Sequence, residues 1–532
     1  MPTLNWIGKD KVQKHPDEVP YRVLNHQYTY PTNGNQESVN KIIHGDNLEA
    51  LKALLPEYEG KVDCIYIDPP YNTGNEGWVY NDNVNDPHIR KWLNQTVGKE
   101  AEDLTRHDKW LCMMYPRLVL LQRLLAPTGV IFISIDDNEQ ANLKLICDEI
   151  FGAGNFQGHI HWRRRNNQPN DKTKLIGLVT EHILVYSRNA QKLKEAGVGK
   201  IPLTGSFSNP DNDERGAWAS KPMKAAKGQG GSIYSIELPD GRHIQTVWLS
   251  EEKTYRNLLN DGRIYFPINK GKYGYPRIKY YKSEREEEGQ CANNWWSNDF
   301  AGCNQDAADE LKNIFSEFTN EQKVFDTPKP VRLLELIINL GNRKNGIFLD
   351  SFAGSGTTAH AVLNLNKRDG GHRRFILVEM CDYAETITAE RVRRVIDGYG
   401  EGNKAVEGTG GSFSYYELGE TIYDPQSGLL NDNADIEHIR RYIWYSETTT
   451  PYQLPTTAQH PYLLGQKDNT RYYFYYRRGE ETVLDRTFLS TFTLADKAEQ
   501  YIIYADCCRL SKDFLLAHHI LFKQIPRDIK KV

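Results

Sequence analysis

The sequence lacks the features of a membrane-spanning or secreted protein. Its 532 residues contain no apolar run approaching the roughly 20 residues that a membrane-spanning helix needs. The first residues, Met1–Trp6, lack the basic and apolar segments of a signal peptide. A mean hydropathy of -0.65 and 26% charged residues are typical of a soluble chain. These absences predict a cytoplasmic protein with no membrane contact.

Cysteine is also scarce, with 8 residues and no pair in CxxC spacing. Cys507 and Cys508 are adjacent, and the others are scattered along the chain. Thiols with neither metal-ligand spacing nor a secretory context are expected to be reduced and free. The sequence therefore predicts neither a disulfide framework nor a metal site.

Charge of one sign is not in excess, since 66 Lys and Arg residues stand against 70 Asp and Glu residues, a net charge of -4. This balance argues weakly against a surface coated in basic residues, so contact with nucleic acid would have to come from local patches. A chain of this length is expected to form about two to four domains, each able to bury a core.

One short apolar segment leads into a stiff, polar turn. Residues Val62–Ile67 are rich in β-branched and aromatic side chains, which predicts a buried strand. Asp68, Pro69, Pro70 and Tyr71 follow it directly. Two prolines fix φ and restrict the residue before them, so Asp68 is expected in an extended turn. Neither proline has an N–H to donate, which leaves both carbonyl groups as free acceptors.

This turn carries the groups needed to hold a planar amine. An exocyclic amino group has two hydrogens, and the Asp68 carboxylate and a proline carbonyl can accept both. That arrangement turns the nitrogen lone pair out of the ring plane and toward an electrophile. Tyr71 can stack on the face of a base. The alternative is a surface Pro-Pro turn, which is the default for an isolated motif.

A second strand end, about half a chain later, is rich in glycine. Gly346–Asp350 predicts a strand and Ala359–Leu363 predicts a helix. The turn between them reads Ser351-Phe352-Ala353-Gly354-Ser355-Gly356-Thr357-Thr358. Its glycines permit positive φ and a close approach of the backbone to a ligand. The string is neither GxGxxG nor a Walker motif with its lysine, which argues against phosphate binding.

The strand after this turn, Arg373–Val378, is followed by Glu379. An acidic residue about 20 residues beyond such a glycine turn is placed to bind ribose hydroxyls. The strand, the glycine turn, the helix and the acid together indicate a nucleoside cofactor.

The order of the two motifs predicts their arrangement in space. In an open parallel sheet, ligands bind beyond the carboxyl ends of the strands, so Asp68 and Phe352 are expected to end neighbouring strands. A circular permutation of one sheet, with an insertion at a surface point, would bring them together. Two unrelated domains with one motif each are the alternative, which leaves the strand–helix alternation on both sides of the insert unexplained.

These residues resemble the motifs of a known family. The chain resembles the adenine-specific DNA methyltransferases of the permuted (beta) class, and more narrowly the modification (Mod) subunits of type III restriction-modification systems. It is shorter than many such subunits. The resemblance covers most of the chain and extends to the segments His44–Leu51, Ile133–Asp137, Glu181–Ser187, Phe325–Pro330 and Ile520–Ile529.

The resemblance implies an α/β fold. This is the Rossmann-like sheet of the methyltransferases that use S-adenosylmethionine, mostly parallel, circularly permuted and closed by an antiparallel hairpin. It implies methyl transfer to the 6-amino group of a flipped-out adenine in duplex DNA. In the family, enzymes whose catalytic motif begins with Asp, as at Asp68 here, mostly methylate adenine, and those that begin it with Ser mostly methylate cytosine. The resemblance also implies a homodimer, a helicase–nuclease (Res) partner, and association with the nucleoid in a prokaryotic cytoplasm.

Residue roles follow from the same resemblance. The catalytic residues would be Asp68, Pro69, Pro70 and Tyr71. Phe352 to Thr357 and Lys329 would hold the methionine end of the cofactor, Glu379 the ribose and Asp46 the adenine. The full cofactor-binding set is Asp46, Lys329, Asp350, Phe352, Ala353, Gly354, Ser355, Gly356, Thr357 and Glu379. No metal is required, because the cofactor already carries an activated leaving group. Asp136 and Asp137, at another strand end, would line the base pocket or cap a helix.

The composition along the chain suggests five segments. These are an N-terminal arm (1–40), a catalytic half (41–190), an inserted target-recognition domain (191–325), a cofactor-binding half (326–405) and a C-terminal domain for dimer or partner contact (406–532). A helix is expected near 107–126, and the closing hairpin near 156–162 and 181–187.

The inserted domain is the candidate DNA reader. Between Arg263 and Lys282 it has basic and aromatic residues and no acid, the pattern of a nucleic-acid surface. A second basic run lies earlier in the chain. The expected DNA contacts are Arg163, Arg164, Arg165, Lys270, Lys272, Arg277, Lys279 and Lys282. The alternative is a solvated β-face whose long side chains carry no ligand.

Other functions remain open on the sequence alone. The chain could be a solitary methyltransferase, or one acting on the cytosine 4-amino group, on RNA or on a protein glutamine. Protein-glutamine enzymes resemble the catalytic motif but typically begin it with Asn, in the unpermuted order and without a large insert. A non-catalytic DNA-recognition subunit and a generic S-adenosylmethionine-binding scaffold are further alternatives, although both motifs are intact.

Overall fold

The computed structural model describes most of the chain in two compact units. The described residues are 3–32, 37–73, 106–317 and 324–529, without 171, 174, 204, 342, 425–426, 451, 454–459 and 494–496. The sequence also predicts a polar loop near 72–105, and this segment lies almost wholly outside the described residues. One unit comprises Met1–Val198 and Asn293–Val532, and the other Gly199–Ala292.

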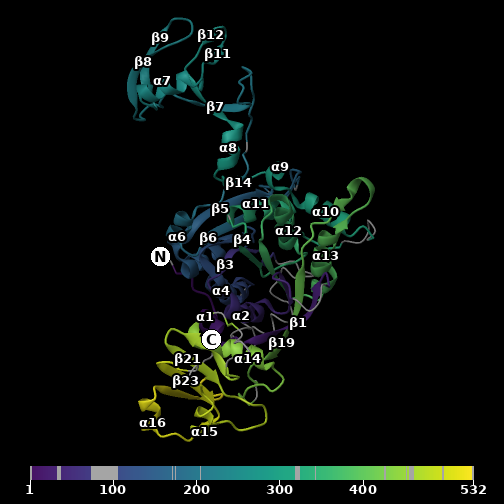
Figure 1. Cartoon of the computed structure of the whole chain (residues 1–532). Coiled ribbons are helices and arrows are strands. Elements are labelled where there is room, and N and C mark those ends of the chain that lie inside the picture. Colours follow the sequence, from purple (N-terminus) through teal and green to yellow (C-terminus); the bar gives the residue numbers. More distant parts are fainter. Residues whose placement is uncertain are drawn as a thin grey trace. The chain divides into compact units, whose positions relative to one another are not determined.

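A sheet of ten strands organises the larger unit (Figure 1). Its order is β1-β19-β2-β16-β15-β3-β4-β6-β5-β14. The five strands from β2 to β4 in this order are mutually parallel. They are β2 (Lys41–His44), β16 (Arg374–Glu379), β15 (Ile347–Asp350), β3 (Val62–Ile67) and β4 (Leu125–Ile135). Parallel strands from the two halves of the chain therefore form one sheet, as the permuted arrangement predicts.

The closing hairpin is also present. Strand β6 (Thr180–Ser187) pairs antiparallel with both β4 and β5 (Phe156–Arg163). The short strand β14 (Trp295–Trp296) adds to the outer side of β5 in parallel. The α/β fold expected from the sequence, mostly parallel with an antiparallel hairpin, is thus confirmed.

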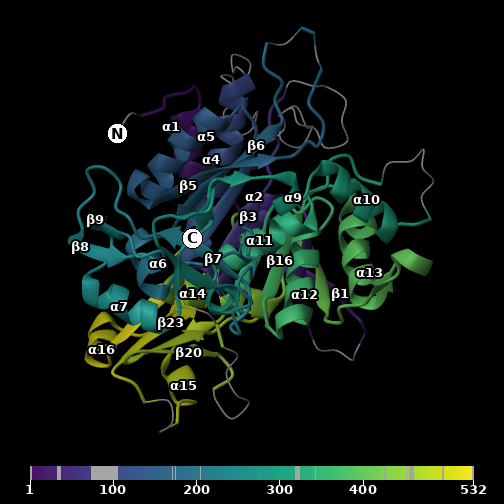
Figure 2. The same ribbon diagram turned by 90° about the horizontal axis from the view of Figure 1, so that it is seen from above.

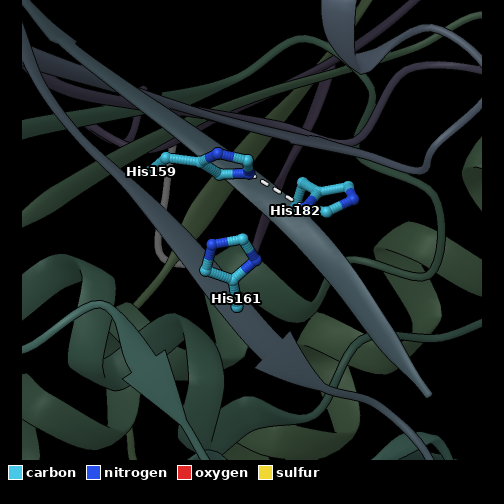
Figure 3. A group of neighbouring side chains, drawn as sticks. All are labelled: His159, His161 and His182. Atoms are coloured by element: carbon cyan, nitrogen blue, oxygen red, sulfur yellow. Dashed lines mark hydrogen bonds between the residues drawn. The ribbon is translucent and has the colours of Figure 1, made fainter. Parts of the chain in front are cut away.

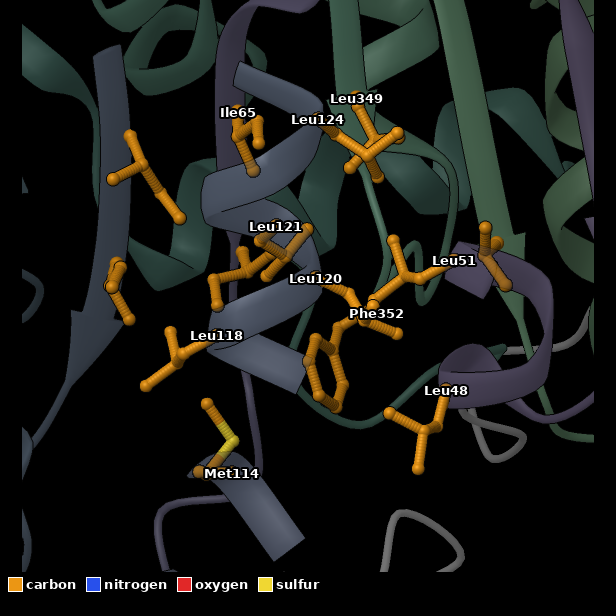
Figure 4. Close-up of a cluster of buried hydrophobic side chains, with 14 of the residues drawn as sticks. Leu48, Leu51, Ile65, Met114, Leu118, Leu120, Leu121, Leu124, Leu349 and Phe352 are labelled. Carbon is orange, nitrogen blue, oxygen red and sulfur yellow. The ribbon is translucent and has the colours of Figure 1, made fainter. Parts of the chain in front are cut away.

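Helices cover both faces of the parallel strands (Figures 1 and 2). Ile65 points to the main core, where it joins Leu121 of α4 (Arg106–Leu124) and Leu51 of α2 (Asn47–Tyr58) (Figure 4). Ile67 belongs to the same core. Alternate residues point the other way, and an added Cβ at Gly341, in α11 (Val331–Gly341), would lie 3.1 Å from the Cβ of Cys64. Burial on both faces explains why these strands read as continuous apolar runs.

The remaining helices of this core flank the same layers. They are α1 (Lys9–Glu18), α5 (Gln140–Cys147) and α6 (Ala190–Ala196) from the first half of the chain. The second half supplies α9 (Asn298–Ala301), α10 (Asn304–Ile314), α12 (Thr357–Asp369) and α13 (Glu390–Asp397). The helix expected near 107–126 is α4. Among the described residues, no helix is long and apolar enough to cross a membrane.

The structure corrects the expected segment boundaries at both ends of the chain. Strand β19 (Phe413–Thr421), expected in a separate C-terminal domain, pairs in parallel with β2 inside the main sheet. Strand β1 (Arg22–Tyr30), expected in an irregular arm, pairs antiparallel with β19. Strand β1 ends the sheet and β19 lies between it and β2, and the aromatic and polar composition of both segments is why they did not read as core.

The C-terminal residues beyond β19 form a small α/β module. Its sheet has the order β20-β21-β23-β25, with β20 (Leu463–Lys467), β21 (Thr470–Phe474), β23 (Gln500–Ala505) and β25 (Ile520–Gln524). A strand pair, β22 (Val483–Leu484) with β24 (Cys507–Cys508), lies beside it. The module also contains α14 (Ile436–Thr448), α15 (Arg486–Leu489) and α16 (Lys512–Ala517).

The smaller unit is built mainly of short antiparallel strands around its own core. One sheet has the order β10-β13-β7, and two hairpins pair β8 with β9 and β11 with β12. The strands are β7 (Trp218–Pro222), β8 (Ser232–Glu237), β9 (His243–Trp248), β10 (Ile264–Tyr265), β11 (Ile268–Asn269), β12 (Lys272–Tyr273) and β13 (Arg277–Tyr281). Its helices are α7 (Glu252–Asn260) and α8 (Lys282–Glu288). This unit occupies the middle of the expected inserted domain but is narrower than it.

Candidate active site

The two sequence motifs meet at one cavity. Strands β3 and β15 are direct neighbours, with Cys64 opposite Phe348 and Ile65 opposite Leu349, so Asp68 and Phe352 follow adjacent strand ends. A cavity of about 270 Å³ lies there. The expected site residues that line it are Asp68, Pro69, Tyr71, Lys329, Asp350, Phe352, Ala353, Gly354, Ser355 and Thr357. Pro70, Asp46, Gly356 and Glu379 lie outside its lining.

Both carboxylate oxygens of Asp68 already accept hydrogen bonds. The Tyr71 hydroxyl donates to Oδ1 at 2.6 Å and the Lys329 ammonium donates to Oδ2 at 2.6 Å. Lys329 Nζ lies 3.0 Å from the Tyr71 oxygen and 5.2 Å from the centre of its ring. The lysine therefore holds the acid and the aromatic residue of the motif together.

The proline carbonyl groups differ from the expectation that both are free. The Trp110 indole N–H, on α4, donates to the Pro70 carbonyl at 2.6 Å, and Trp110 is fully buried. This bond anchors the Pro-Pro turn to the helix. Pro69 lines the cavity, so its carbonyl is the one left to serve as an acceptor there.

Glu181 and Arg164 complete a buried charge network that the sequence did not reveal. Glu181, on β6, accepts from Tyr71 at 3.2 Å and from Arg164 at 2.8 Å, and lies 3.4 Å from Lys329 Nζ. Burial lowers the pKa of Lys329, but the charges of Asp68 and Glu181 outweigh this and raise it overall. Burial raises the pKa of Asp68, and the charge of Lys329 opposes that shift. Lys329 thus stays protonated between two carboxylates.

The glycine turn has a backbone that only glycine adopts easily. Gly354 and Gly356 have φ values of 51° and 79°. A Cβ at Gly356 would lie 3.0 Å from the Thr388 carbonyl oxygen. The turn leads into α12, whose N-cap residue, Gly356, offers no side-chain acceptor to the first N–H groups of the helix. This helix end is suited to an anionic group.

Arg391, which sequence reasoning missed, holds the glycine turn through hydrogen bonds to two of its side chains. It is fully buried on α13 and donates to Ser355 Oγ at 2.9 Å and Thr357 Oγ1 at 2.8 Å. Its nearest acid is Glu310, at 3.7 Å. The only sequence signal is that it is an arginine on the apolar face of an amphipathic helix.

Glu379 and Asp46 lie outside the cavity lining and have hydrogen-bond partners within the protein. Glu379 is buried and accepts from the N–H groups of Gly354 at 2.7 Å and Cys381 at 3.1 Å, which ties the glycine turn to β16. Asp46 caps α2 by accepting from the N–H groups of Leu48 and Glu49. Their expected contacts with ribose and adenine remain predictions.

Asp350 is the last residue of β15 and is bonded within the turn. It accepts from the Phe352 N–H at 3.0 Å and from the Thr358 hydroxyl at 2.5 Å. Burial raises its pKa from 3.8 to about 7. Asp350 is therefore protonated in the folded state over a range where it is ionised in the unfolded chain.

This shift predicts a pH-dependent effect of the Asp350→Asn variant. Between pH values of about 4 and about 7 the folded state binds the extra proton, so the contribution of Asp350 to the free energy of unfolding falls as pH rises and is lowest above pH 7. Asn cannot ionise, so its melting temperature relative to wild type is expected to be higher at pH 8 than at pH 5. Thermal unfolding at both pH values measures this difference. An equal difference at both would mean that Asp350 is ionised throughout.

The predicted DNA-contact residues fall into different environments. The exposed Lys270 and Lys272 lie at the β11–β12 hairpin, and no ion pair to either occurs among the described residues. The predicted DNA contact of Lys279 is wrong, because this side chain is buried and pairs with Asp211 and with Asp213, the latter at 2.8 Å. Its charge is already neutralised and is not available to a phosphate.

The other predicted contacts are partly committed to internal bonds. Arg277 donates to the Ser220 hydroxyl at 2.8 Å, and Lys282 lies 3.3 Å from Glu286. In the arginine run, Arg163 bonds backbone carbonyls of its own loop, whereas Arg164 and Arg165 line the cavity. The structure thus gives Arg164 a place in the active-site network.

The two strand-end acids divide between two roles. Asp136 lines the cavity, as one sequence hypothesis proposed. Asp137 instead lies 2.9 Å from His182 Nε2. The other cavity residues that sequence reasoning did not select are Tyr66, Thr73, Asn304, Phe325, Thr327, Pro328 and Thr358. Phe325, Thr327 and Pro328 belong to a segment noted for its resemblance, which was the one available signal.

The α/β sheet combines parallel strands from both halves of the chain and places an acid–Pro–Pro–aromatic turn beside a glycine turn. A family model described as DNA methylase matches residues 62–390, more than half of the 532-residue chain, and the chain belongs to this family.

Curated relatives narrow the comparison. The StyLTI Mod subunit of a type III restriction-modification enzyme from Salmonella typhimurium is 39% identical over 70% of this chain and 57% of its own length. The EcoPI Mod subunit of Escherichia phage P1 is 33% identical over 71% of this chain and 63% of its own. The type II methyltransferase M.KpnI from Klebsiella pneumoniae is 31% identical over 64% of this chain and 80% of its own. The chain thus spans about three fifths of the length of these type III relatives.

Proposed function

We propose that the protein transfers the methyl group of S-adenosylmethionine to the 6-amino group of a flipped-out adenine in duplex DNA, as the modification and specificity subunit of a type III restriction-modification system. The observation that carries this proposal is the adjacency of β3 and β15, which places the Asp68–Tyr71 turn and the glycine turn around one cavity. The type III Mod subunits among the relatives support it.

The residues of the glycine turn fit the proposed cofactor. The amino end of α12 and the Thr357 hydroxyl suit a carboxylate, and the left-handed Gly354 allows the backbone to approach a ligand closely. Ser351 Oγ, in the same turn, is buried and has no hydrogen-bond partner among the described residues, but Ser351 lies outside the cavity lining. S-Adenosylmethionine would supply a methyl group already activated by its sulfonium.

Asp68 must exchange one internal bond to hold a target amine. The Tyr71 hydroxyl has a second acceptor in Glu181, at 3.2 Å, so it can release Asp68 Oδ1 without losing all its hydrogen bonds. Asp68 Oδ1 and the Pro69 carbonyl would then accept the two amine hydrogens, while the Tyr71 ring stacks on the base. A raised pKa suits Asp68 to take the proton that the methylated nitrogen must lose.

A base paired inside a duplex cannot reach such a cavity, so the target has to leave the helix. We assign reading of the surrounding sequence to the smaller unit, whose exposed lysines provide part of the phosphate contact. By likeness to the Mod subunits, the assembly would be a homodimer that joins a Res subunit and acts on the nucleoid.

One observation favours a second candidate, a solitary methyltransferase. The chain matches 80% of the length of M.KpnI, a type II methyltransferase, but a smaller share of the Mod subunits. Base-resolution methylation sequencing of DNA from cells expressing the protein tests both candidates. Methyladenine at one sequence motif supports the proposal. Methylcytosine would show that the enzyme methylates the cytosine 4-amino group instead, and no methylation would refute the proposal. Co-purification with a helicase–nuclease distinguishes the type III subunit from the solitary enzyme.

Replacing Lys270 and Lys272 together with alanine tests the role of the smaller unit. Duplex binding is expected to weaken, and the slope of log affinity against log salt to flatten by about 0.9 for each phosphate that the protein no longer neutralises. Affinity for S-adenosylmethionine should stay at the wild-type value. Lys192 and Lys194, exposed on α6 of the larger unit, provide a matched control pair. A salt slope equal to wild type would mean that the two hairpin lysines are exposed to solvent without contacting DNA phosphates.

A further inference from the structure

Three histidines gather away from the catalytic cavity, on two neighbouring strands. His159 and His161 alternate along β5, and His182 lies directly opposite His161 on β6. One ring nitrogen from each lies within 4.8 Å of the others. Figure 3 shows the three rings grouped on one face of this strand pair. His182 is buried and the other two are partly exposed, so the group is reachable from solvent.

The spacing of the rings is close to that of a metal site. His159 Nε2 and His182 Nδ1 are 2.9 Å apart and share a hydrogen bond. Zinc–nitrogen bonds of about 2.0–2.1 Å separate the nitrogens of a tetrahedral site by about 3.3 Å. An ion could therefore replace the shared proton after small rotations of the rings. His161 would complete three ligands and leave a fourth position for water.

A carboxylate orients the most buried of the three rings. His182 Nε2 lies 2.9 Å from Asp137 Oδ1, on the strand end next to β6. If Nε2 carries the proton and donates it to Asp137, Nδ1 keeps its lone pair and points toward His159. Histidine ligands of metals almost always donate their other N–H in this way, which fixes the tautomer and raises the basicity of the ligand.

We propose that His159, His161 and His182 form a binding site for a divalent transition metal ion, with Zn²⁺ as its occupant and Asp137 as the carboxylate that orients His182. Imidazole nitrogen suits Zn²⁺ and not the oxygen-seeking Mg²⁺ or Ca²⁺. Glu181, which lines the catalytic cavity, precedes His182 on β6 and points to the opposite face of the sheet. The ion would therefore lie outside the catalytic cavity and brace the closing hairpin against β4.

This site differs from the sequence expectation, which found no metal site because it considered cysteine spacing. The signal was the His-x-His alternation at 159 and 161, which puts both rings on one face of a strand. Recognising the third ligand requires the β5–β6 register, because it lies about 20 residues further along the chain.

The test uses full-length, tag-free protein that has been stripped with a chelator and dialysed. Calorimetric titration with Zn²⁺ is expected to give one ion per chain, and Co²⁺ to give the visible absorption of a four-coordinate site. His161→Ala, which removes one ligand, should weaken Zn²⁺ binding by at least about 100-fold, and Asp137→Asn by about 10–100-fold. S-Adenosylmethionine binding, measured separately, reports on the catalytic cavity and not on this site.

Two control variants exclude other sources of binding. His26→Ala removes an exposed strand histidine on β1, and Cys291→Ser removes an exposed thiol. Both should bind Zn²⁺ as wild type does. Absence of a stoichiometric site in wild type would overturn the proposal, as would equal affinity in wild type and in both His161→Ala and His159→Gln. Circular dichroism of each variant establishes that a loss of binding is not a loss of folding.

Discussion

Replacing Asp68 with alanine is expected to lower methyl transfer by on the order of 10³-fold, the scale seen when a preorganised group that stabilises the transition state is removed. The variant loses the acceptor that orients the amine and takes its proton. Its partners, Tyr71 and Lys329, remain and can bond Glu181 instead. Single-turnover methylation of a duplex carrying the recognised sequence measures the effect, and duplex affinity should stay within a few-fold of wild type.

Two further variants sharpen this result. Asp68→Asn keeps one carbonyl acceptor but cannot take a proton, so its activity should fall between wild type and Asp68→Ala. Asp10→Ala removes an exposed acid on α1 and should be as active as wild type. If Asp68→Ala retained a substantial part of the wild-type rate, Asp68 would not be the residue that holds the amine.

Replacing Lys329 with methionine is expected to lower the rate at pH 7 by at least about 100-fold, because proton transfer and orientation both depend on an ionised Asp68. Lys329 is the cation that bonds Asp68 directly, and its charge holds the pKa of that acid down against burial. Without it the pKa rises further, so less of Asp68 is ionised at pH 7. Raising the pH restores the ionised form.

The pH dependence separates this role from simple loss of structure. The Lys329→Met variant should regain part of its activity between pH 7 and pH 9, whereas wild type should not show the same gain. Lys329→Arg keeps the charge and should lose less activity than Lys329→Met. A variant equally inactive at every pH, with normal folding and cofactor affinity, would show that Lys329 contributes something other than its charge.

The sequence predicted the parallel sheet and the meeting of its two motifs because both depend on local patterns. An apolar strand followed by Asp68-Pro69-Pro70, and another followed by Gly354 and Gly356, each specify a strand end with a rigid turn. The rule that ligands bind beyond the carboxyl ends of strands then requires the two ends to be adjacent. The structure confirms this adjacency at β3 and β15.

The charge network could not be read in the same way. Glu181 and Arg164 meet because β5 and β6 pair in a particular register, and a one-residue shift would send either side chain to the other face. For Lys279, local sequence predicted a DNA contact that the structure contradicts. Its neighbours in sequence are basic and aromatic, but Asp211 and Asp213, which neutralise it, lie more than 60 residues earlier. Local composition does not contain that information.

The strand order of the sheet also governs when the protein can fold. The sheet neighbour of β3 on one side, β15, begins about 280 residues after β3 ends, and β19, the neighbour of β2, comes later still. At about 5–20 residues per second, β3 waits roughly 15–60 s on the ribosome for this partner. During that time the apolar edges of β2 and β3 have no native neighbour on that side and are exposed to aggregation. A permuted sheet of this kind must therefore close at a late stage of synthesis, so yield on expression should depend on chaperones and on the rate of translation.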